Sequence, residues 1–476
     1  MIGGDHSSDA AAVRPVSRAV TAELLARHDR PGPRYTSYPT AVEFHEGIST
    51  HDYLARLASA DAIGDAPLAL YMHLPFCEDR CLFCGCHTII TKHRHVADPY
   101  LGLLKRETEL LAERLPNRRA FAQLHLGGGT PTYYTPGQLT DLISHTLRHF
   151  RPLPGAELAI EADPRVTSAA HIDALADLGF NRISFGVQDL TPVVQEAIGR
   201  TQSLEQTAEL VTRARSRGFR GINVDLIYGL PYQTPESFER TVDSVIGLGV
   251  DRAAVYSFAF VPWVRGHQKK IEQRQLPPAE LKVMLFAIAR ERFLEAGYEP
   301  IGMDHFARPD DELARAKHEG RLRRNFQGYA VIPGDDVVGL GVSAIGDVRG
   351  AYVQNEKKLS TYEEAIAAGR LPVVRGVARS PDDEVRRTVI HELMCNFRVD
   401  VAAIDRLYDI SFADYFADDL ALLRAHETDG LVRIEPACIE ATPVGELFVR
   451  SLAMCFDRYQ RERHDGDAHP VFSRAI

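Results

Sequence analysis

The sequence has no excess of basic residues and no long apolar run. Its 55 Lys and Arg stand against 65 Asp and Glu, which gives a formal net charge of −10. Proteins that bind nucleic acid or anionic membranes need a basic surface, so this balance argues against both kinds of partner. The apolar stretches also fall well short of the ~20 residues that a membrane-spanning helix needs. We therefore expect neither a nucleic-acid partner nor a membrane partner.

The first residues lack the features of a secretion signal. The stretch MIGGDHSSDAAAVRP has no basic start followed by an apolar segment, so we expect a cytoplasmic protein. Hydrophobic residues make up 45% of the chain and charged residues 25%, which is typical of a globular protein. The length of 476 residues corresponds to roughly three domains of ~150 residues, although barrels often form larger single units.

Cysteine is scarce, with seven residues in the chain, which is too few for a disulfide-based fold of this length. Their placement is uneven. Four of them lie within ten residues: Cys77, Cys81, Cys84 and Cys86. In a reducing compartment such a group indicates a metal or cluster site. The other three lie in apolar surroundings and are predicted to be buried thiols of the core: Cys395, Cys438 and Cys455.

From residue 68 onward, short apolar runs alternate with stretches of helical periodicity. The runs predict buried parallel strands at 68–74, 122–128, 157–163, 182–188, 222–230 and 253–259. The periodic stretches predict helices at 99–115, 135–150, 168–179, 234–249 and 279–296. Successive strand–helix units imply a parallel sheet with right-handed crossovers. A partly closed barrel and a flat doubly wound sheet are both compatible with this pattern.

Changes in composition divide the chain into three parts. Residues 1–50 form an arm whose segment RPGPRYTSYPT, rich in Pro, Tyr and Arg, is typical of a chain that packs on a folded domain. Residues 51–375 contain the strand–helix units and a Gly-rich segment, VVGLGVSAIGDV. A boundary is expected within 371–382. Residues 376–476 are predicted to form a small, mainly helical domain with one short strand pair.

Three of the clustered cysteines have the spacing C-x3-C-x2-C directly after the first predicted strand. The carboxyl end of a strand is where α/β folds place their chemistry. Zinc usually takes four ligands from two separated pairs, and the sequence has no second pair. Three thiolates suit a four-iron cluster with one iron left open, whereas clusters of electron carriers use four cysteines. Zinc and a chance group of buried thiols are the alternatives.

The motif resembles that of the radical S-adenosylmethionine superfamily. Longer segments resemble the oxygen-independent coproporphyrinogen III oxidase family within it: YMHLPFCEDRCLFCGCHTIIT, HLGGGTPTY, IEADPR, FNRISFGVQD, NVDLIYGLP, GMDHFARPDDELA and NFQGY. The similarity extends from about Arg34 to the carboxyl-terminal FSRAI. It implies an α/β fold, with a partial parallel (β/α)6 barrel of the TIM type, an amino-terminal arm and a small, mainly helical carboxyl-terminal domain.

The resemblance also implies a reaction. Two propionate side chains of coproporphyrinogen III would be decarboxylated oxidatively to vinyl groups, giving protoporphyrinogen IX in haem biosynthesis. A 5′-deoxyadenosyl radical, made from S-adenosylmethionine at a 4Fe-4S cluster, would abstract hydrogen from the propionate β-carbon. A low-potential electron donor of the flavodoxin or ferredoxin type and a monomeric protein are expected. The alternatives are a haem-binding relative, which would lack Cys86 and the arm, and a radical methyltransferase acting on a macrocycle.

Residue roles follow from the same resemblance. Cys77, Cys81 and Cys84 would bind the cluster, and Cys86 would lie near the substrate without binding iron. The expected contacts of two S-adenosylmethionine molecules are Tyr71, Phe83, Gly128, Gly129, Thr130, Glu161, Gln188, Arg200, Asp225, Ala259 and Ile345. Tyr71 and Glu161 are also expected to act in catalysis with Cys86.

Some of these residues also have a purely structural interpretation. Glu161 is a carboxylate inside an apolar run, so a buried ion pair is its structural alternative. Gln188 and Asp225 are expected at the ends of later strands, and Arg200 in a helical region. The four carboxylates of the substrate need cations at the mouth of the site. The candidates are Lys92, His93, Arg94, His95, Arg30 and Arg34, although most charge runs are solvated surface.

Overall fold

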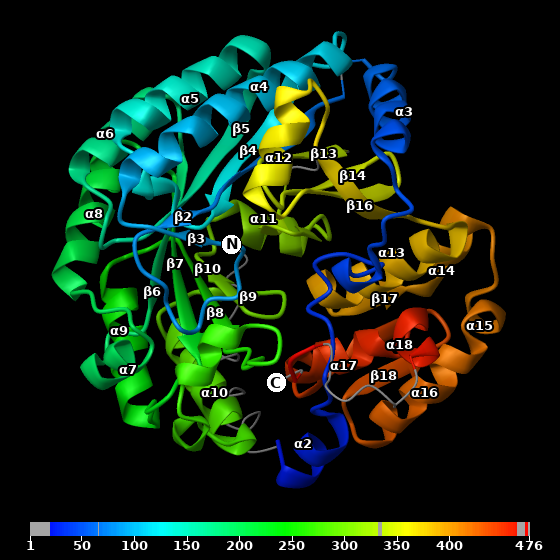
Figure 1. The fold of residues 1–476 in the computed structure, drawn as a ribbon. Coiled ribbons are helices and arrows are strands. Elements are labelled where there is room, and N and C mark those ends of the chain that lie inside the picture. Colours follow the sequence, from blue (N-terminus) through cyan, green and yellow to red (C-terminus); the bar gives the residue numbers. More distant parts are fainter. Residues whose placement is uncertain (1–19, 65, 332–335, 464–471, 475–476) are drawn as a thin grey trace, which may run out of the picture.

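The computed structural model describes residues 20–64, 66–331, 336–463 and 472–474, and expectations for the remaining residues, including 1–19 of the arm, lie outside this range. A sheet of twelve strands forms the centre of the molecule (Figure 1). Six neighbouring strands run parallel in the order β1-β4-β5-β6-β7-β8. They are β1 Leu68–Leu74, β4 Ala120–Gly128, β5 Arg151–Ala162, β6 Arg182–Gln188, β7 Gly221–Tyr228 and β8 Arg252–Ser257.

These strands confirm the six predicted runs, with shifts at the ends. Their side chains also decide between the two arrangements that the sequence left open. Residues from all six strands line one interior cavity, which a flat sheet does not allow. The sheet is therefore a partly closed barrel, with the helices on its outer face (Figure 1).

The helices between the strands begin with strong capping signals. Side chains of Thr135, Ser203 and Thr234 each accept a hydrogen bond from the first turn and complete a capping box. The helices are α4 Asp98–Arg114, α5 Pro136–His149, α6 Ala169–Asp177, α7 Pro192–Ala197, α8 Leu204–Ser216, α9 Pro235–Gly247 and α10 Ala279–Glu295. Arg200 was expected in a helical region, and this is wrong: Gly199 takes a positive φ of 65° after α7, and Arg200 lies in the loop before α8.

The Gly-rich segment forms strands that the sequence did not predict. Strand β13 pairs in parallel with β1, and β14, β15 and β16 continue the sheet as an antiparallel meander. At the opposite edge, β10 and β9 pair antiparallel beside β8. The bounds are β9 Glu299–Ile301, β10 His305–Ala307, β13 Asp336–Leu340, β14 Ile345–Val348, β15 Ala351–Asn355 and β16 Val373–Ala378.

The carboxyl-terminal part is mainly helical and contains the expected strand pair, which a third strand extends. Its elements are α13 Pro381–Asn396, β17 Arg398–Asp400, α14 Val401–Tyr408, α15 Phe412–Tyr415, α16 Ala417–Thr428, β18 Val432–Glu435, β19 Cys438–Ala441, α17 Val449–Met454 and α18 Arg458–Glu462. Of the three outlying cysteines, Cys395 and Cys455 are buried as predicted, whereas Cys438 is only half-buried.

The arm packs on the carboxyl-terminal part. Leu25 of α2 (Ala22–His28), together with Tyr35 and Tyr38, belongs to the apolar cluster built by α13, α16 and α17. Gly32 donates a main-chain hydrogen bond of 3.0 Å to Ser473. The remaining elements are α3 Thr50–Asp61, β2 Phe76–Cys77, β3 Ile89–Ile90, α11 Glu312–His318, β11 Arg323–Asn325, β12 Gly328–Ala330 and α12 Leu359–Ala367.

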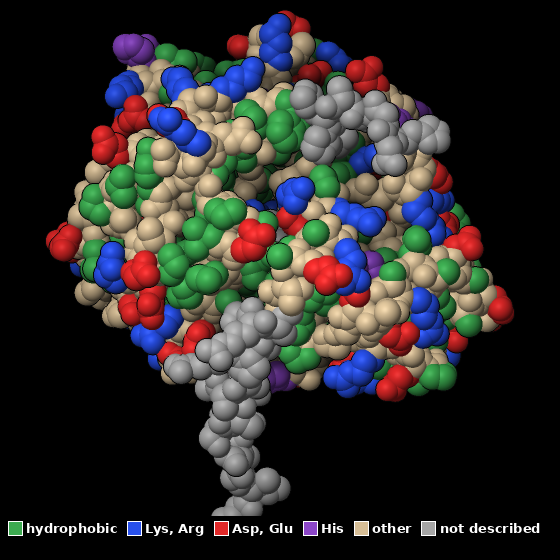
Figure 2. Space-filling model, turned by 90° about the horizontal axis from the view of Figure 1, so that it is seen from below, with side chains coloured by type: hydrophobic (Ala, Val, Ile, Leu, Met, Phe, Trp, Pro, Cys, Tyr) green, Lys and Arg blue, Asp and Glu red, His purple; other side chains and the backbone are tan. Residues whose placement is uncertain are grey.

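The apolar character of the helices and the charges on the surface both bear on possible partners. Among the described residues, no helix combines the length and the apolar composition needed to span a bilayer. Acidic and basic side chains are interspersed over the face shown in Figure 2, without an extended patch of either sign.

Candidate active site

The cysteine loop follows β1 and is fixed by main-chain contacts on both sides. Strands β2 and β3 pair in parallel across its base, and the Thr91 amide donates to the Cys77 carbonyl at 3.0 Å. On the other side, the His267 ring lies 2.9 Å from the Cys84 carbonyl. The loop therefore has a defined shape at the carboxyl end of the barrel strands, which is where the sequence predicted the chemistry.

A cavity of about 260 Å³ lies in front of this loop. It brings together most of the predicted site residues, which come from different strands and loops. Those that line it are Cys77, Cys81, Phe83, Cys84, Cys86, Gly128, Gly129, Thr130, Glu161, Gln188, Arg200 and Asp225. A cavity of this kind, mixed in polarity and set at the strand ends, is the usual form of a small-molecule site.

Two arginines approach the sulfur of Cys81. Arg200 Nη1 lies 3.4 Å from it and Arg165 Nη2 lies 3.5 Å from it. Both guanidinium groups also bind the buried Asp163 carboxylate, at 2.9 and 2.7 Å. The Asp163 carboxylate thus holds two cations against one sulfur, an arrangement that stabilises negative charge on a thiolate.

Cys86 and Cys84 interact directly with each other. The Cys86 amide donates to the Cys84 sulfur at 3.4 Å. Hydrogen bonding from Cys86 holds the pKa of Cys84 below its usual value, and the same interaction raises the pKa of Cys86. The side chain of Cys86 is exposed to the cavity. Of these two thiols, Cys84 is therefore the one that ionises more readily.

The glycines after β4 allow close approach to the loop. A Cβ at Gly129 would lie 2.5 Å from the Pro75 carbonyl group, which is main chain and does not move easily. Gly128 has a φ of 118°, which side chains disfavour. Glycine at these two positions lets the β4 end pack against the start of the cysteine loop. The Gly129 amide donates a hydrogen bond to the Leu74 carbonyl at 2.8 Å, and the Thr130 amide donates one to the Phe76 carbonyl at 2.9 Å.

Glu161 lies next to this strand end. Its carboxylate accepts a hydrogen bond of 3.2 Å from the Gly128 amide, and the His125 ring lies 3.4 Å away. Burial raises the pKa of Glu161, but these contacts outweigh it, so that the pKa falls below its usual value. The carboxylate is therefore charged and oriented, and 46% of its side-chain surface is accessible within the cavity.

Asp225 does not end its strand, contrary to the sequence expectation. It lies within β7, and its carboxylate accepts hydrogen bonds from Ser184 at 2.9 Å and Asn223 at 2.8 Å. Burial raises its pKa to about 6. Gln188 does end β6, with a φ of 69° that turns the chain. Strand alternation, rather than strand termination, brings Asp225 into the cavity.

Three predicted residues do not line this cavity. The Tyr71 ring stacks on His125 at a centroid distance of 6.0 Å, and its hydroxyl lies 3.1 Å from His73 Nδ1, so it supports the Glu161 region. Ala259 is linked to Phe83, because Gln268 Nε2 donates to both main-chain carbonyls at 3.1 and 3.3 Å. Ile345 packs beside an aromatic cluster of Phe44, Phe326 and Tyr352.

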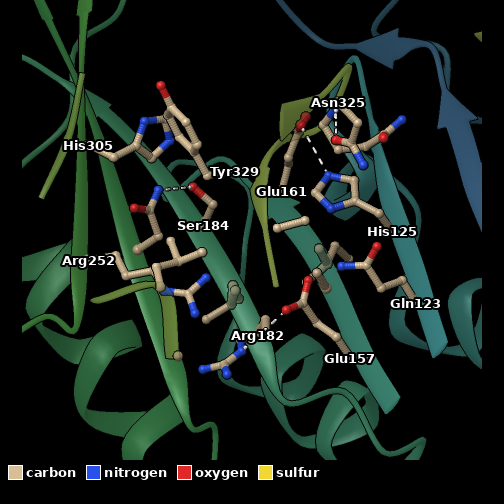
Figure 3. A pocket seen from close by; sticks show the side chains of 18 of the residues that line it. Gln123, His125, Glu157, Glu161, Arg182, Ser184, Arg252, His305, Asn325 and Tyr329 are labelled. Carbon is tan, nitrogen blue, oxygen red and sulfur yellow. Dashed lines mark hydrogen bonds and ion pairs between the residues drawn. The ribbon is translucent and has the colours of Figure 1, made fainter. Parts of the chain in front are cut away.

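A second cavity of about 140 Å³ occupies the barrel interior next to the first (Figure 3). The residues that line both cavities are Glu161, Ser184, Asp225 and Tyr256. Figure 3 shows Glu161 and His125 pointing toward each other, whereas Glu157 and Arg182 face one another nearer the amino ends of the strands, 3.7 Å apart. The barrel interior is thus polar and continuous with the space in front of the thiols.

The predicted substrate cations mostly bind to the protein itself. Lys92 pairs with Asp79 at 3.2 Å, and Arg94 pairs with Glu78 at 2.6 Å. Arg34 donates to the Ser257 carbonyl at 2.6 Å. The remaining candidates lie at or near short helical segments: Arg30, which binds the Arg27 carbonyl, and His93 and His95, whose rings pack together.

The spacing of the thiols distinguishes between metal groups. Ligands of one zinc ion lie close together, because each sulfur is about 2.3 Å from the metal. Among the described residues, the only three ligand atoms within 4.8 Å of one another belong to Glu109, His145 and His149 on α4 and α5, so the thiols of the cysteine loop do not form such a group. The wider spacing fits a multi-iron cluster with three cysteine ligands.

Sequence reasoning missed several residues of the site. Asp163 and Arg165 stand in the same segment as Glu161, IEADPR, and their charges were an available signal. Tyr256 and Ser184 gave no signal, because an aromatic residue and a serine in a strand are common core residues.

Comparison with known proteins agrees with this geometry. The model of the Radical SAM superfamily matches residues 71–245, and that of the HemN C-terminal domain matches residues 380–448. The oxygen-independent coproporphyrinogen III oxidase of Pseudomonas aeruginosa is 45% identical, over 92% of this chain and 95% of that protein. The enzyme of Escherichia coli is 43% identical, over 92% and 95%. The solved structure of coproporphyrinogen III oxidase from Escherichia coli, described as a radical SAM enzyme, matches with a TM-score of 0.86 and 44% identity, over 89% of this chain and 97% of that chain.

Proposed function

The chain belongs to the oxygen-independent coproporphyrinogen III oxidase family, within the radical S-adenosylmethionine superfamily, and from this premise we propose its reaction. The enzyme decarboxylates two propionate side chains of coproporphyrinogen III oxidatively to vinyl groups and so forms protoporphyrinogen IX. Each propionate loses one hydrogen atom, carbon dioxide and one electron. The observation that carries the proposal is the cavity in which three widely spaced thiols face Glu161 and Cys86.

We propose that Cys77, Cys81 and Cys84, which line the cavity, would hold a 4Fe-4S cluster, and three protein ligands would leave one iron open for S-adenosylmethionine. When bound, the cluster and S-adenosylmethionine would supply the radical chemistry that removes a hydrogen atom from the propionate β-carbon. Arg165 and Arg200 stabilise the negative charge of the Cys81 thiolate, from 3.5 and 3.4 Å. The protein contributes ligands, charge compensation and exclusion of water.

Binding of S-adenosylmethionine is assigned to the residues around Glu161. This carboxylate is charged and held by Gly128 and His125, so it is suited to accept hydrogen bonds from the cationic amino group of the cofactor. Tyr71 supports His125 by stacking, and Ile345 contributes an apolar contact. Gly128, Gly129 and Thr130 line the cavity, and the two glycines let the end of β4 pack closely against neighbouring protein, so that this strand end borders the space proposed for the cofactor.

A second S-adenosylmethionine is proposed on the other side of the cavity. Its contacts are Phe83, Gly129, Thr130, Gln188, Arg200, Asp225 and Ala259. Cys86 is proposed to lie near this second molecule and the substrate, without binding iron. The support for this arrangement is the resemblance of the motifs and the shared cavity that most of these residues line.

The remaining partners follow from the reaction. We propose a low-potential donor of the flavodoxin or ferredoxin type, a monomeric protein in the cytoplasm, and no nucleic-acid or membrane partner. The haem-binding and methyltransferase alternatives are not favoured, because the relatives that match over most of the chain are coproporphyrinogen III oxidases.

An anaerobic assay tests the proposed function. Purified protein with a reconstituted cluster is incubated with coproporphyrinogen III, S-adenosylmethionine and a reductant, and the products are separated and weighed by mass spectrometry. The expected products are the divinyl porphyrinogen and 5′-deoxyadenosine. A methylated macrocycle would indicate a methyltransferase, and bound but unchanged macrocycle would indicate a binding protein.

A further inference from the structure

Three basic side chains lie beside the cysteine loop and take no part in the site described above. They are Arg265, Lys357 and Arg375, the basic cluster. Arg265 and Lys357 lie near His87, the residue that follows Cys86, and Arg375 lies near Lys357. The three come from distant parts of the chain, so their proximity arises from the fold and forms no run in the sequence.

Contacts with the cysteine loop hold two of these segments in place. Arg265 precedes the short helix η4 (Gly266–Lys270), whose His267 ring lies 2.9 Å from the Cys84 carbonyl. Lys357 follows β15, and the His87 ring forms a hydrogen bond with its main chain. Arg265 and Lys357 therefore reach the loop from two different sides.

Strand register positions the third side chain. Ile345, Gln354 and Arg375 are cross-strand neighbours on β14, β15 and β16. Gln354 accepts a hydrogen bond of 2.7 Å from Arg375 Nε, and the Phe44 ring lies 5.9 Å from the guanidinium carbon. Within the described part of the chain, the two terminal nitrogens of Arg375 bind nothing. The contacts with Gln354 and Phe44 thus orient the Arg375 guanidinium, and its two terminal nitrogens are available to donate hydrogen bonds to a ligand.

The basic cluster has no acidic partner among the described residues, unlike Lys92, Arg94 and Arg34, which pair with Asp79, Glu78 and Asp304. The Glu356 amide donates to the Pro372 carbonyl at 2.8 Å, which places Lys357 beside the strand that carries Arg375. Burial lowers the pKa of Lys357, and the charges of Arg375 and Arg265 lower it further. Like charges repel more strongly as water is removed. The basic cluster is therefore a local concentration of positive charge in a protein with a net charge of −10, and an anionic ligand that binds to it would relieve the repulsion among its three cations.

We propose that the basic cluster binds carboxylates of the substrate, and that this contact determines which propionate lies at Cys86 during each turnover. The inference rests on the proposed function and adds a subsite to it. Coproporphyrinogen III has four propionates, of which two react, so the others need partners during the reaction. Guanidinium and ammonium groups are the side chains best suited to carboxylates, and a guanidinium binds both oxygens at once.

Equilibrium binding tests the proposal without turnover. The holoenzyme, kept anaerobic and without reductant, is titrated with coproporphyrin III and, separately, with its tetramethyl ester, and porphyrin fluorescence is followed. The variants are Arg265→Gln, Lys357→Gln and Arg375→Gln. Lys269→Gln is the control, because Lys269 is an exposed lysine in the same segment as Arg265. Lys357→Arg keeps the charge.

Each Gln variant should bind the tetra-acid about tenfold or more weakly, as expected for a lost charge-assisted contact. Binding of the ester should be the same in wild type and in the Gln variants. Lys269→Gln and Lys357→Arg should bind the tetra-acid as wild type does. In turnover, KM for coproporphyrinogen III should rise more than kcat falls, while iron content and cleavage of S-adenosylmethionine stay normal. Unchanged binding of the tetra-acid, or an equal loss for the ester, would overturn the proposal.

Failure of the proposed function looks different. Wild-type enzyme would then form no vinyl product, whatever the variants bind. If wild-type enzyme forms the vinyl product and all three variants keep the wild-type KM, the proposed function stands and the basic cluster is not a substrate site.

Discussion

The Tyr35 hydroxyl donates a hydrogen bond of 2.9 Å to the Asp457 carboxylate, 422 residues further along the chain. Both side chains are 1% exposed. Asp457 also caps α18 by accepting from the Gln460 amide at 3.2 Å. The arm and the carboxyl-terminal helices are therefore joined through one buried carboxylate.

Because the Asp457 carboxylate is buried, we predict that the free energy of unfolding depends on pH. Burial raises the pKa of Asp457 to about 6, from 3.8 in its ordinary state. Between about pH 4 and pH 6 the unfolded chain loses this proton while the folded chain keeps it, so the free energy of unfolding falls as pH rises, by roughly 2–3 kcal/mol in total. Asp457→Asn should abolish this contribution, so urea midpoints at pH 4.5 and 7 should differ less than in wild type. Tyr35→Phe keeps the carboxylate and should keep the difference; parallel pH profiles for Asp457→Asn and wild type would contradict the prediction.

Replacement of any one cluster thiol should remove the cluster. Cys77→Ser, Cys81→Ser and Cys84→Ser each leave only two thiolates, which do not hold four irons. We expect loss of most iron and sulfide per chain and of all activity. Cys438→Ser, in the distant β19, is the control and should keep the wild-type iron content. A full cluster in any of the first three variants would exclude that residue as a ligand.

Cys86→Ser should separate the cluster from the reaction. The fourth thiol lies beside Cys84 in the cavity, and only Gly85 stands between them in the chain. We expect normal iron per chain and a loss of vinyl product of a hundredfold or more, roughly the size of a lost catalytic proton-transfer group. Both quantities are measured on one anaerobic sample. Loss of iron would make Cys86 a ligand, and full activity would leave it without a role.

Glu161→Gln should weaken the use of S-adenosylmethionine and leave iron unchanged. The substitution keeps the size of the side chain but removes the charge that Gly128 and His125 stabilise, so an affinity loss of about tenfold or more is expected. Asp225→Asn should have an effect in the same direction. Calorimetric titration with S-adenosylmethionine and an iron assay check both variants, with Glu205→Gln on the surface of α8 as the control. A parallel loss of iron would mean that the carboxylates are structural.

Gly129→Ala and Gly85→Ala form a matched pair. An added methyl group at Gly129 meets the Pro75 main chain at 2.5 Å, whereas at Gly85 nothing lies within 4 Å. Gly129→Ala should displace the β4 end from the cysteine loop, with a loss of about tenfold or more in S-adenosylmethionine affinity and a lower thermal midpoint. Gly85→Ala should behave like wild type in both measurements. Equal behaviour of the two variants would show that close approach at Gly129 is not needed.

The barrel strands could be predicted because they are buried on both faces and appear as continuous apolar runs. The cysteine spacing and the motif resemblance also predicted the family and most of the residues that line the cavity. The division into residues 1–50, 51–375 and 376–476 stays a prediction, as do the individual roles of the site residues.

The features that could not be predicted from the sequence depend on the pairing of segments that are far apart in the chain. Strands β13 to β16 are short and Gly-rich, and nothing local indicates that they extend the sheet beside β1. The basic cluster was missed for the same reason, since Arg265, Lys357 and Arg375 become neighbours only through strand pairing and loop contacts. Arg30, Arg34 and the run 92–95 were chosen instead because they are adjacent to motifs, but adjacency in sequence does not reveal that Asp79 and Glu78 pair with Lys92 and Arg94.

The carboxylate of Asp163, which binds Arg165 and Arg200 at once, limits how this site can change over evolutionary time. Loss of Asp163 would leave the guanidinium groups of Arg165 and the buried Arg200 without their shared counterion, and loss of one arginine would leave an excess of negative charge beside the Cys81 sulfur. No single substitution among the three restores the balance. We therefore expect positions 163, 165 and 200 to vary together among descendants of this sequence or not at all.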